Sequence, residues 1–235
     1  MIKELKRLLD QGHNIAIITG SGKDYIIEQV PLIHSNLTLL PCNGTQIWQW
    51  MLNEGKDEWY CNHKEELDPE IRAKLHAFLE QTLSTMKPEL PKDLQTPTGE
   101  VIQHRPSMIN FCPIGRGADQ VKRDNFQQVD IQSEFRQRWL PVLRVECKKL
   151  GFTAVMGGVT SFDIFPEGWD KTYSLKKARD TIFRSECPLL CEGILFIGNS
   201  FFTNGNDACM LNQQDVICME VKNPDGTLEI LRKIK

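Results

Sequence analysis

A short apolar run, followed by a tight turn and a helical pattern, constrains the fold of this chain most strongly. Ile15 to Ile18 predict a buried strand, Thr19 to Gly22 a turn, and Lys23 to Val30 a helix. This order of elements is typical of a parallel α/β sheet. It returns near the C-terminus, where residues 193–197 predict a buried strand that ends in a polar loop. The two ends of the chain therefore predict one α/β domain.

The middle of the chain follows a different pattern. Asp68-Pro69 predicts a helix start, and residues 101–104 and 108–112 predict two strands. Ser133 is the expected cap of a helix that reaches Lys149 and is bent or broken at Pro141, because an interior proline removes a hydrogen bond. We interpret residues 64–165 as an α+β insertion into a domain formed by 1–63 and 166–235.

Other local signals predict the remaining elements. The apolar spacing of residues 2–9, which Gly12 ends, predicts a first helix. Asn43-Gly44 and residues 53–55 predict turns around a strand at 45–51. The last part of the chain is predicted to contain a helix from Lys171 to about Arg184, a helix at 208–212, a strand at 216–221 and a final turn at 224–226.

Composition narrows the classes of function. The net charge of −3 is spread along the chain without a basic tract, which disfavours binding to nucleic acid or to a membrane surface. The eight cysteines form no CxxC pair, and Cys61 and His63 alone are too few ligands for zinc. No apolar run reaches the about 18 residues of a membrane span, and we expect a cytoplasmic protein with reduced thiols.

The segment from Gly157 to Lys171 combines a possible sugar site with a possible phosphate site. In a strand, Ser161 and Asp163 would share one face about 7 Å apart, which suits sugar hydroxyls. The alternative is a half-exposed strand edge. Lys171 lies at a helix start that Asp170 can cap, and a cation there favours an anion nearby, such as phosphate. The alternative is a solvated surface lysine.

Three further groups could bind phosphate or metal. The hydroxyls and backbone N–H groups of the turn at 19–22 can face an anion, although the turn lacks the GxxxxGK[ST] pattern of a P-loop and can equally be a plain turn. Arg105, Arg116 and Arg123 can form a phosphate clamp, or three exposed arginines. The oxygen donors of the loop at 198–207 suit Mg²⁺, although a polar turn explains them too.

Three segments, CPIGR at 112–116, GGVTSFDIFPEGWDK at 157–171 and GNSFFTNGND at 198–207, together resemble the eukaryotic-type phosphomannomutases of the haloacid dehalogenase superfamily. The resemblance implies a Rossmann-type α/β core that carries Mg²⁺ and an aspartate nucleophile, with an inserted α+β cap that binds the sugar phosphate. It also implies an isomerase that interconverts mannose 1-phosphate and mannose 6-phosphate, and a homodimer formed through the cap.

The resemblance assigns a role to each candidate residue. Lys171 would neutralise the phosphoryl group during transfer, beside the hydroxyls of Thr19 and Ser21, and Asn199 and Asp207 would lie at the metal loop. The substrate-binding residues of the cap would be Arg105, Arg116 and Arg123 for the other phosphate, and Ser161 and Asp163 for sugar hydroxyls.

The chain departs from the family in ways that affect its chemistry. The nucleophile of the family lies in a DxDGT segment, which does not occur in this sequence, and Asn199 stands where the family has an aspartate. Pro106-Ser107 replace the usual Asn-Gly. We expect a truncated enzyme or a degenerate relative, poorly folded when expressed alone and with impaired transfer. A Mg²⁺-dependent sugar phosphatase and a non-catalytic sugar-phosphate-binding protein are the alternatives. Both mannose and glucose phosphates are compatible with the arginines.

Overall fold

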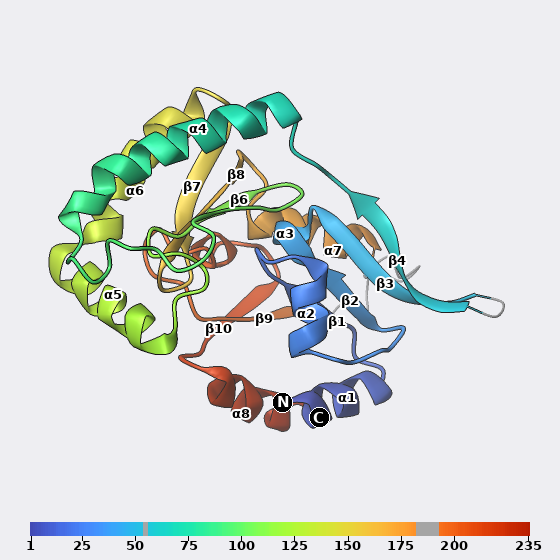
Figure 1. Ribbon diagram of the computed structural model, residues 1–235. Coiled ribbons are helices and arrows are strands. Elements are labelled where there is room, and N and C mark those ends of the chain that lie inside the picture. The colour runs from blue at the N-terminus through green and yellow to red at the C-terminus, as the bar shows by residue number, and fades with distance from the viewer. Residues whose placement is uncertain (54–55, 182–192) are drawn as a thin grey trace. The chain divides into compact units, whose positions relative to one another are not determined.

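The computed structural model describes residues 1–53, 56–181 and 193–235, which divide into two compact units. Unit 1 consists of residues 1–65 and 168–235, and unit 2 consists of residues 66–167. Each boundary falls two residues later than the one expected from the sequence (65 against 63, and 167 against 165). Unit 2 is a continuous segment inserted between the two segments of unit 1, as the chain colours in Figure 1 show.

Parallel strand pairing organises unit 1. Its strands are β1 (Ile15–Ile18), β2 (Leu37–Leu40), β3 (Gln46–Asn53), β4 (Lys56–Lys64), β9 (Ile194–Gly198) and β10 (Val216–Glu220). One sheet has the order β1-β2-β3-β4, in which β1 and β2 are parallel while β3 is antiparallel to both β2 and β4. β9 and β10 form a separate parallel pair. The parallel α/β pattern expected for the two ends of the chain is therefore confirmed.

Helices cover these strands through their apolar faces. The helices of unit 1 are α1 (Ile2–Asp10), α2 (Lys23–Gln29), α7 (Lys171–Thr181) and α8 (Pro224–Lys233), with a 3₁₀ turn at Ala208–Met210. Leu9 of α1 and Ile26 of α2 pack with Leu37 and Leu39 of β2 in one buried cluster. Leu175 of α7 packs against Phe196 of β9 in another. The start of α7 is thereby fixed against the strand that precedes the 198–207 loop.

A left-handed turn, labelled α3 (Pro41–Gly44), connects β2 to β3. Cys42 and Asn43 have φ angles of 50° and 57°, and Gly44 has a φ of 78°. Such angles are costly for residues with a side chain, so the turn must be held by its surroundings. All of its residues are buried. The expected turn at Asn43-Gly44 is therefore present, whereas Glu54 and Gly55 of the second expected turn lie outside the described residues.

Unit 2 is an antiparallel sheet with helices along one side (Figure 1). Its elements are α4 (Pro69–Met86), a 3₁₀ turn (Lys87–Glu89), β5 (Ile102–His104), β6 (Ile109–Phe111), α5 (Gln120–Ser133), α6 (Phe135–Lys148), β7 (Phe152–Gly157) and β8 (Ser161–Pro166). The strand order is β5-β6-β8-β7. Asp68 caps α4 by accepting hydrogen bonds from the N–H groups of Glu70 and Ile71, at 2.9 and 3.1 Å. The expected α+β character of the insertion is confirmed.

Two local predictions are wrong, the Ser133 cap and the final turn at 224–226, and a break at Pro141 does not occur. Ser133 ends α5 and donates to Val129 O instead of capping a helix, and the chain turns at Glu134, with a φ of 52°. The helix α6 then continues through Pro141. Proline has no N–H to donate to the carbonyl of Gln137, but both residues are exposed, so water can solvate that carbonyl.

The second correction concerns the C-terminus. The segment Pro224-Asp225-Gly226 is the first turn of α8 and not a final turn of the chain. Asn223 caps this helix by accepting a hydrogen bond from the N–H of Gly226 at 3.0 Å. A proline in the first turn after such a cap is a helix start signal, which outweighs the turn tendency of Asp-Gly.

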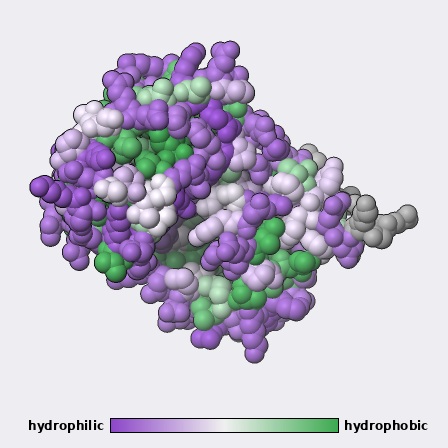
Figure 2. Space-filling view, viewed as in Figure 1, coloured by the Kyte–Doolittle hydropathy of each residue, from purple (hydrophilic) through white to green (hydrophobic). Residues whose placement is uncertain are grey.

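The surface in Figure 2 is mostly hydrophilic, with apolar residues in separate groups among polar ones. Large exposed apolar side chains of unit 2 include Val121 and Ile131 of α5 and Val145 of α6. Within the described ranges, no helix combines the length and the hydrophobicity that crossing a membrane requires.

A pair of histidines links α4 to β5 in unit 2. Nδ1 of His76 lies 2.9 Å from Nε2 of His104, and the rings are stacked with their centroids 5.0 Å apart. Within the described residues, Nδ1 of His104 is buried without a hydrogen-bond partner. Burial lowers the pKa of His104, and the nearby charges of His76 and Arg72 lower it further against the opposing effect of Glu100. Protonation would place a charge where it is poorly solvated.

Acidification is therefore expected to destabilise unit 2 through His104. Its native pKa lies below the ordinary value of about 6.5, so the native state binds fewer protons than the unfolded state, and stability falls as the pH drops below that value. Urea unfolding at about pH 7.5 and about pH 5.5, on either side of the ordinary histidine pKa, should show a smaller pH effect in His104→Phe than in the parent. His13→Gln in unit 1 serves as the control. An unchanged pH effect in His104→Phe would contradict this expectation.

Candidate functional site

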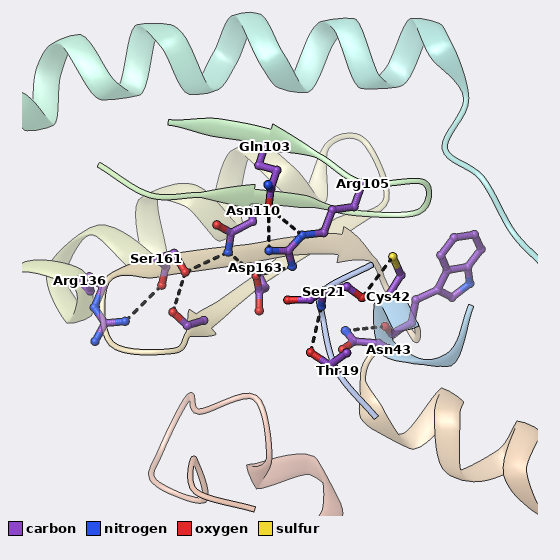
Figure 3. A network of polar contacts seen from close by, with 12 residues as sticks. Thr19, Ser21, Cys42, Asn43, Gln103, Arg105, Asn110, Arg136, Ser161 and Asp163 are labelled. Carbon is purple, nitrogen blue, oxygen red and sulfur yellow. Dashed lines mark hydrogen bonds and ion pairs between the residues drawn. The ribbon is translucent and has the colours of Figure 1, made fainter. Parts of the chain in front are cut away.

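The predicted sugar-binding residues Ser161 and Asp163 lie on β8, one of the two inner strands of the unit 2 sheet. β8 pairs with β6 on one side and β7 on the other, and Asn110 of β6 lies opposite Asp163. Asn110 Nδ2 donates to Ser161 Oγ at 2.9 Å and to Asp163 Oδ1 at 2.7 Å (Figure 3). Ser161 and Asp163 are 3 % and 6 % exposed, so the alternative of a half-exposed strand edge is wrong. The side chains form a buried polar network.

Arg105 joins this network from the end of β5. Its Nη1 lies 3.7 Å from Asp163 Oδ1, and both side chains are buried. Its Nε and Nη2 donate to Gln103 Oε1 at 3.2 and 3.0 Å (Figure 3). Neither Gln103 nor Asn110 was predicted from the sequence as a site residue. The signal for Asn110 was its polar side chain between two apolar residues of a short strand, where a buried amide must find partners.

Arg116 and Arg123 lie together but differ in what they contact. Arg123 donates through Nε to Ala118 O at 2.8 Å and through Nη2 to Arg116 O at 2.7 Å. These bonds hold the loop after β6 and occupy Nε and Nη2 with protein carbonyls, while Nη1 lies 3.5 Å from Thr160 Oγ1. Nε of Arg116 is buried without a partner among the described residues. The geometry therefore assigns Arg123 a positioning contact to the backbone of Arg116.

In unit 1, the left-handed turn after β2 is hydrogen-bonded to the turn at 19–22, which was predicted to bind phosphate. The N–H of Cys42 donates to Ser21 O at 3.0 Å, and the N–H of Asn43 donates to Thr19 O at 2.9 Å. Thr19 Oγ1 accepts the N–H of Ser21 at 3.1 Å. Asn43 Nδ2 also donates to Trp169 O at 3.2 Å, just before α7 (Figure 3). Asn43, which the sequence analysis did not identify as a site residue, links the turn at 19–22 to the start of α7.

Lys171, the first residue of α7, forms an ion pair with Asp207. The side chains are 11 % and 0 % exposed, so the alternative of a solvated lysine is wrong. Asp207 Oδ1 accepts from Lys171 Nζ, and Oδ2 accepts the N–H groups of Asn199 and Ser200 at 3.0 and 2.9 Å. Asp170 caps α7 as expected, because its Oδ1 accepts the N–H of Thr172 at 2.8 Å. The anion that Lys171 was expected to need is supplied by the protein.

The residues of this loop do not fit a magnesium site as they are placed. Mg²⁺ requires near-octahedral oxygen ligands with at least one available carboxylate. Both oxygens of Asp207 are engaged by protein donors, and Asn199 Oδ1 accepts Ser200 Oγ at 3.2 Å. Within the part of the chain that the structure describes, no group of three or more His, Cys, Asp or Glu side chains could hold a metal ion.

The thiols of Cys209, two residues after Asp207, and of Cys147 in α6 are poor nucleophiles. Burial raises the pKa of Cys209 to about 11, and burial raises the pKa of Cys147 to about 12. The thiolate is the reactive form of cysteine, so these two residues are inert at neutral pH.

Comparison with known proteins identifies the family. The family model described as eukaryotic phosphomannomutase matches residues 1–235. The phosphomannomutase of Spinacia oleracea is 30 % identical over 97 % of this chain and 83 % of that protein. Phosphomannomutase 2 of Dictyostelium discoideum is 34 % identical over 59 % of this chain. The chain matches about half the length of several such relatives, 53 % for the Dictyostelium protein and 58 % for the Saccharomyces cerevisiae phosphomannomutase.

Solved structures share the fold at low sequence identity. The N-terminally truncated, IMP-bound IMP-nucleotidase of Plasmodium falciparum has a TM-score of 0.64 and 16 % identity over 98 % of this chain and 61 % of that chain. A haloacid dehalogenase-like hydrolase from Bacteroides thetaiotaomicron has a TM-score of 0.51 and 16 % identity over 99 % of this chain and 91 % of that chain. With the match of the family model across all 235 residues, these findings show that the chain belongs to the eukaryotic phosphomannomutase family and has a haloacid dehalogenase-like α/β fold.

Proposed function

We propose that unit 2 of this chain binds a hexose phosphate, with mannose 1-phosphate and mannose 6-phosphate as the first candidates, and that phosphoryl transfer is impaired. The buried network of Arg105, Asp163, Asn110 and Ser161 supports the binding part of the proposal. A carboxylate and an amide suit sugar hydroxyls, which both donate and accept, and an arginine fork suits phosphate. Asn110 Oδ1 is buried without a partner among the described residues, as expected of a group that awaits a ligand.

Two observations support impaired transfer. The sequence contains no DxDGT segment to supply the aspartate nucleophile, and its one DGT tripeptide, Asp225 to Thr227, lies in the first turn of α8. Haloacid dehalogenase enzymes generally depend on Mg²⁺, whereas Asp207 is engaged by Lys171 and two backbone N–H groups. Lys171 and the Thr19–Ser21 turn would then hold a phosphoryl group without passing it on.

Binding can be tested with a pair of neighbouring glycines. A Cβ at Gly157 would lie 2.7 Å from Asp163 Cγ, whereas a Cβ at Gly158 would have nothing within 4 Å. Gly157→Ala is therefore expected to weaken mannose 6-phosphate binding, measured by calorimetry, by at least about tenfold, while Gly158→Ala, which adds backbone strain at a φ of 52° but no contact with Asp163, leaves the affinity nearly unchanged. Equal affinities of the two variants, or failure of the parent to bind mannose 6-phosphate more tightly than mannose, would contradict the proposal.

Turnover measurements separate the possible activities. We expect the chain to produce no measurable interconversion of mannose phosphates, with or without a hexose bisphosphate activator. Bisphosphate-stimulated interconversion would show an active mutase, and release of inorganic phosphate would show a sugar phosphatase. We still predict that the isolated chain folds poorly, that it forms a homodimer through unit 2 and that it is cytoplasmic.

A further inference from the structure

The buried carboxylate of Asp207 has a protein donor on each of its oxygens. Lys171 Nζ donates to one oxygen, and the N–H groups of Asn199 and Ser200 donate to the other. The loop also closes tightly around the carboxylate, since a Cβ on Gly198 would lie 2.6 Å from Oδ2. A fully buried carboxylate needs both a counter-charge and hydrogen-bond donors, and Asp207 receives both from the chain itself.

A divalent cation at this loop would have to displace one of these partners or lie beside the ammonium of Lys171. At Oδ1, it would either replace the ammonium of Lys171, which would then lose its counter-charge, or lie beside that ammonium and be repelled by it, in a place where the lysine side chain is only 11 % exposed. To coordinate Oδ2, it would leave the N–H groups of Asn199 and Ser200 without their acceptor. Asn199 brings no negative charge in return. Mg²⁺ also gives up its own waters reluctantly, so the exchange is unfavourable at each step.

We propose that Asp207 is a positioning residue for Lys171 and not a magnesium ligand, and that Lys171 takes the place of a divalent cation in anion binding by unit 1. Lysine carries three N–H donors, and the pair with Asp207 uses one of them. The ammonium can therefore hold a phosphate-type anion while Asp207 fixes its position at the start of α7. Anion binding at unit 1 is then independent of Mg²⁺.

The test uses the whole chain with inorganic phosphate and divalent cations as probes, and the variant Lys171→Met separates phosphate binding at unit 1 from phosphate binding by the arginines of unit 2. We expect the same phosphate affinity, within about twofold, in EDTA and in millimolar Mg²⁺, and no saturable heat when Mg²⁺ is added alone. Mn²⁺ should not selectively broaden the backbone amide signals of Asn199 and Ser200. Selective broadening of these two signals, or phosphate binding that requires Mg²⁺, would overturn the proposal.

Three variants test the roles of Lys171 and Asn199 separately. Lys171→Met should weaken the phosphate affinity by the same factor in EDTA and in Mg²⁺, whereas Lys171→Arg, which keeps the positive charge, should retain more of it. Asn199→Asp supplies a second carboxylate and is expected to gain a Mg²⁺ response that the parent lacks. If the parent already responds to Mg²⁺ as strongly as Asn199→Asp does, Asp207 acts as a metal ligand and the proposal fails.

Discussion

Replacing Asp163 by alanine is expected to lower the free energy of unfolding of unit 2 by about 3 to 5 kcal/mol, the usual cost of removing one partner from a buried ion pair. Its side chain is 8 % exposed and that of Arg105 is 7 % exposed, with 3.7 Å between Nη1 and Oδ1. Asn110 Nδ2 would also lose an acceptor at 2.7 Å. The Asp163 carboxylate is therefore both the counter-charge of Arg105 and a hydrogen-bond acceptor of Asn110.

An exposed ion pair of the same unit provides the control. Arg138 Nη2 lies 3.0 Å from Glu89 Oε2, but these side chains are 51 % and 37 % exposed. Because water solvates the remaining charge, Glu89→Ala should cost about 0 to 1 kcal/mol. Urea unfolding of the parent and of both variants at neutral pH measures the contrast. Similar losses for Asp163→Ala and Glu89→Ala would show that burial does not determine the strength of the Arg105 pair.

Local signals in the sequence were sufficient for most of the fold. The apolar run of β1, the cap Asp68 of α4 and the alternation of Ser161 and Asp163 in β8 depend on neighbouring residues, so their patterns could be interpreted directly. The same holds for the Asp170 cap of α7. Pro224 was misinterpreted because proline and Asp-Gly favour both turns and helix starts, and the Asn223 cap decides between them.

Contacts between distant residues set the limit of what the sequence could predict. Helix polarity indicated that Lys171 needs an anion, but nothing near it in the sequence indicated that Asp207, thirty-six residues later, supplies that anion. Asn110 likewise meets Asp163 across a strand pairing that joins residues fifty-three positions apart. The first contact joins a helix start to a loop and the second joins two paired strands, and neither partner is indicated by the residues next to it in the sequence.

The left-handed turn after β2 shows what such long-range contacts require of the backbone. Gly44 has a φ of 78°, and a Cβ built on it would lie 2.6 Å from Ser174 Cα, a backbone atom of α7 that cannot move aside alone. Cys42 and Asn43 of the same turn donate to the carbonyls of Ser21 and Thr19. The close approach of Gly44 to α7 therefore keeps the turn at 19–22 connected to the helix that carries Lys171.

Gly44→Ala is consequently expected to destabilise unit 1 by about 2 to 5 kcal/mol, the sum of left-handed strain and overpacking against the backbone. Gly12→Ala is the matched control, because Gly12 also has a positive φ, 93°, but a Cβ there has nothing within 4 Å. It should cost only the backbone strain, about 1 to 2 kcal/mol. Thermal and urea unfolding measure both losses, and amide spectra of residues 19–22 should change in Gly44→Ala alone. Equal losses and unchanged spectra would mean that contact with Ser174 does not hold the turn in place.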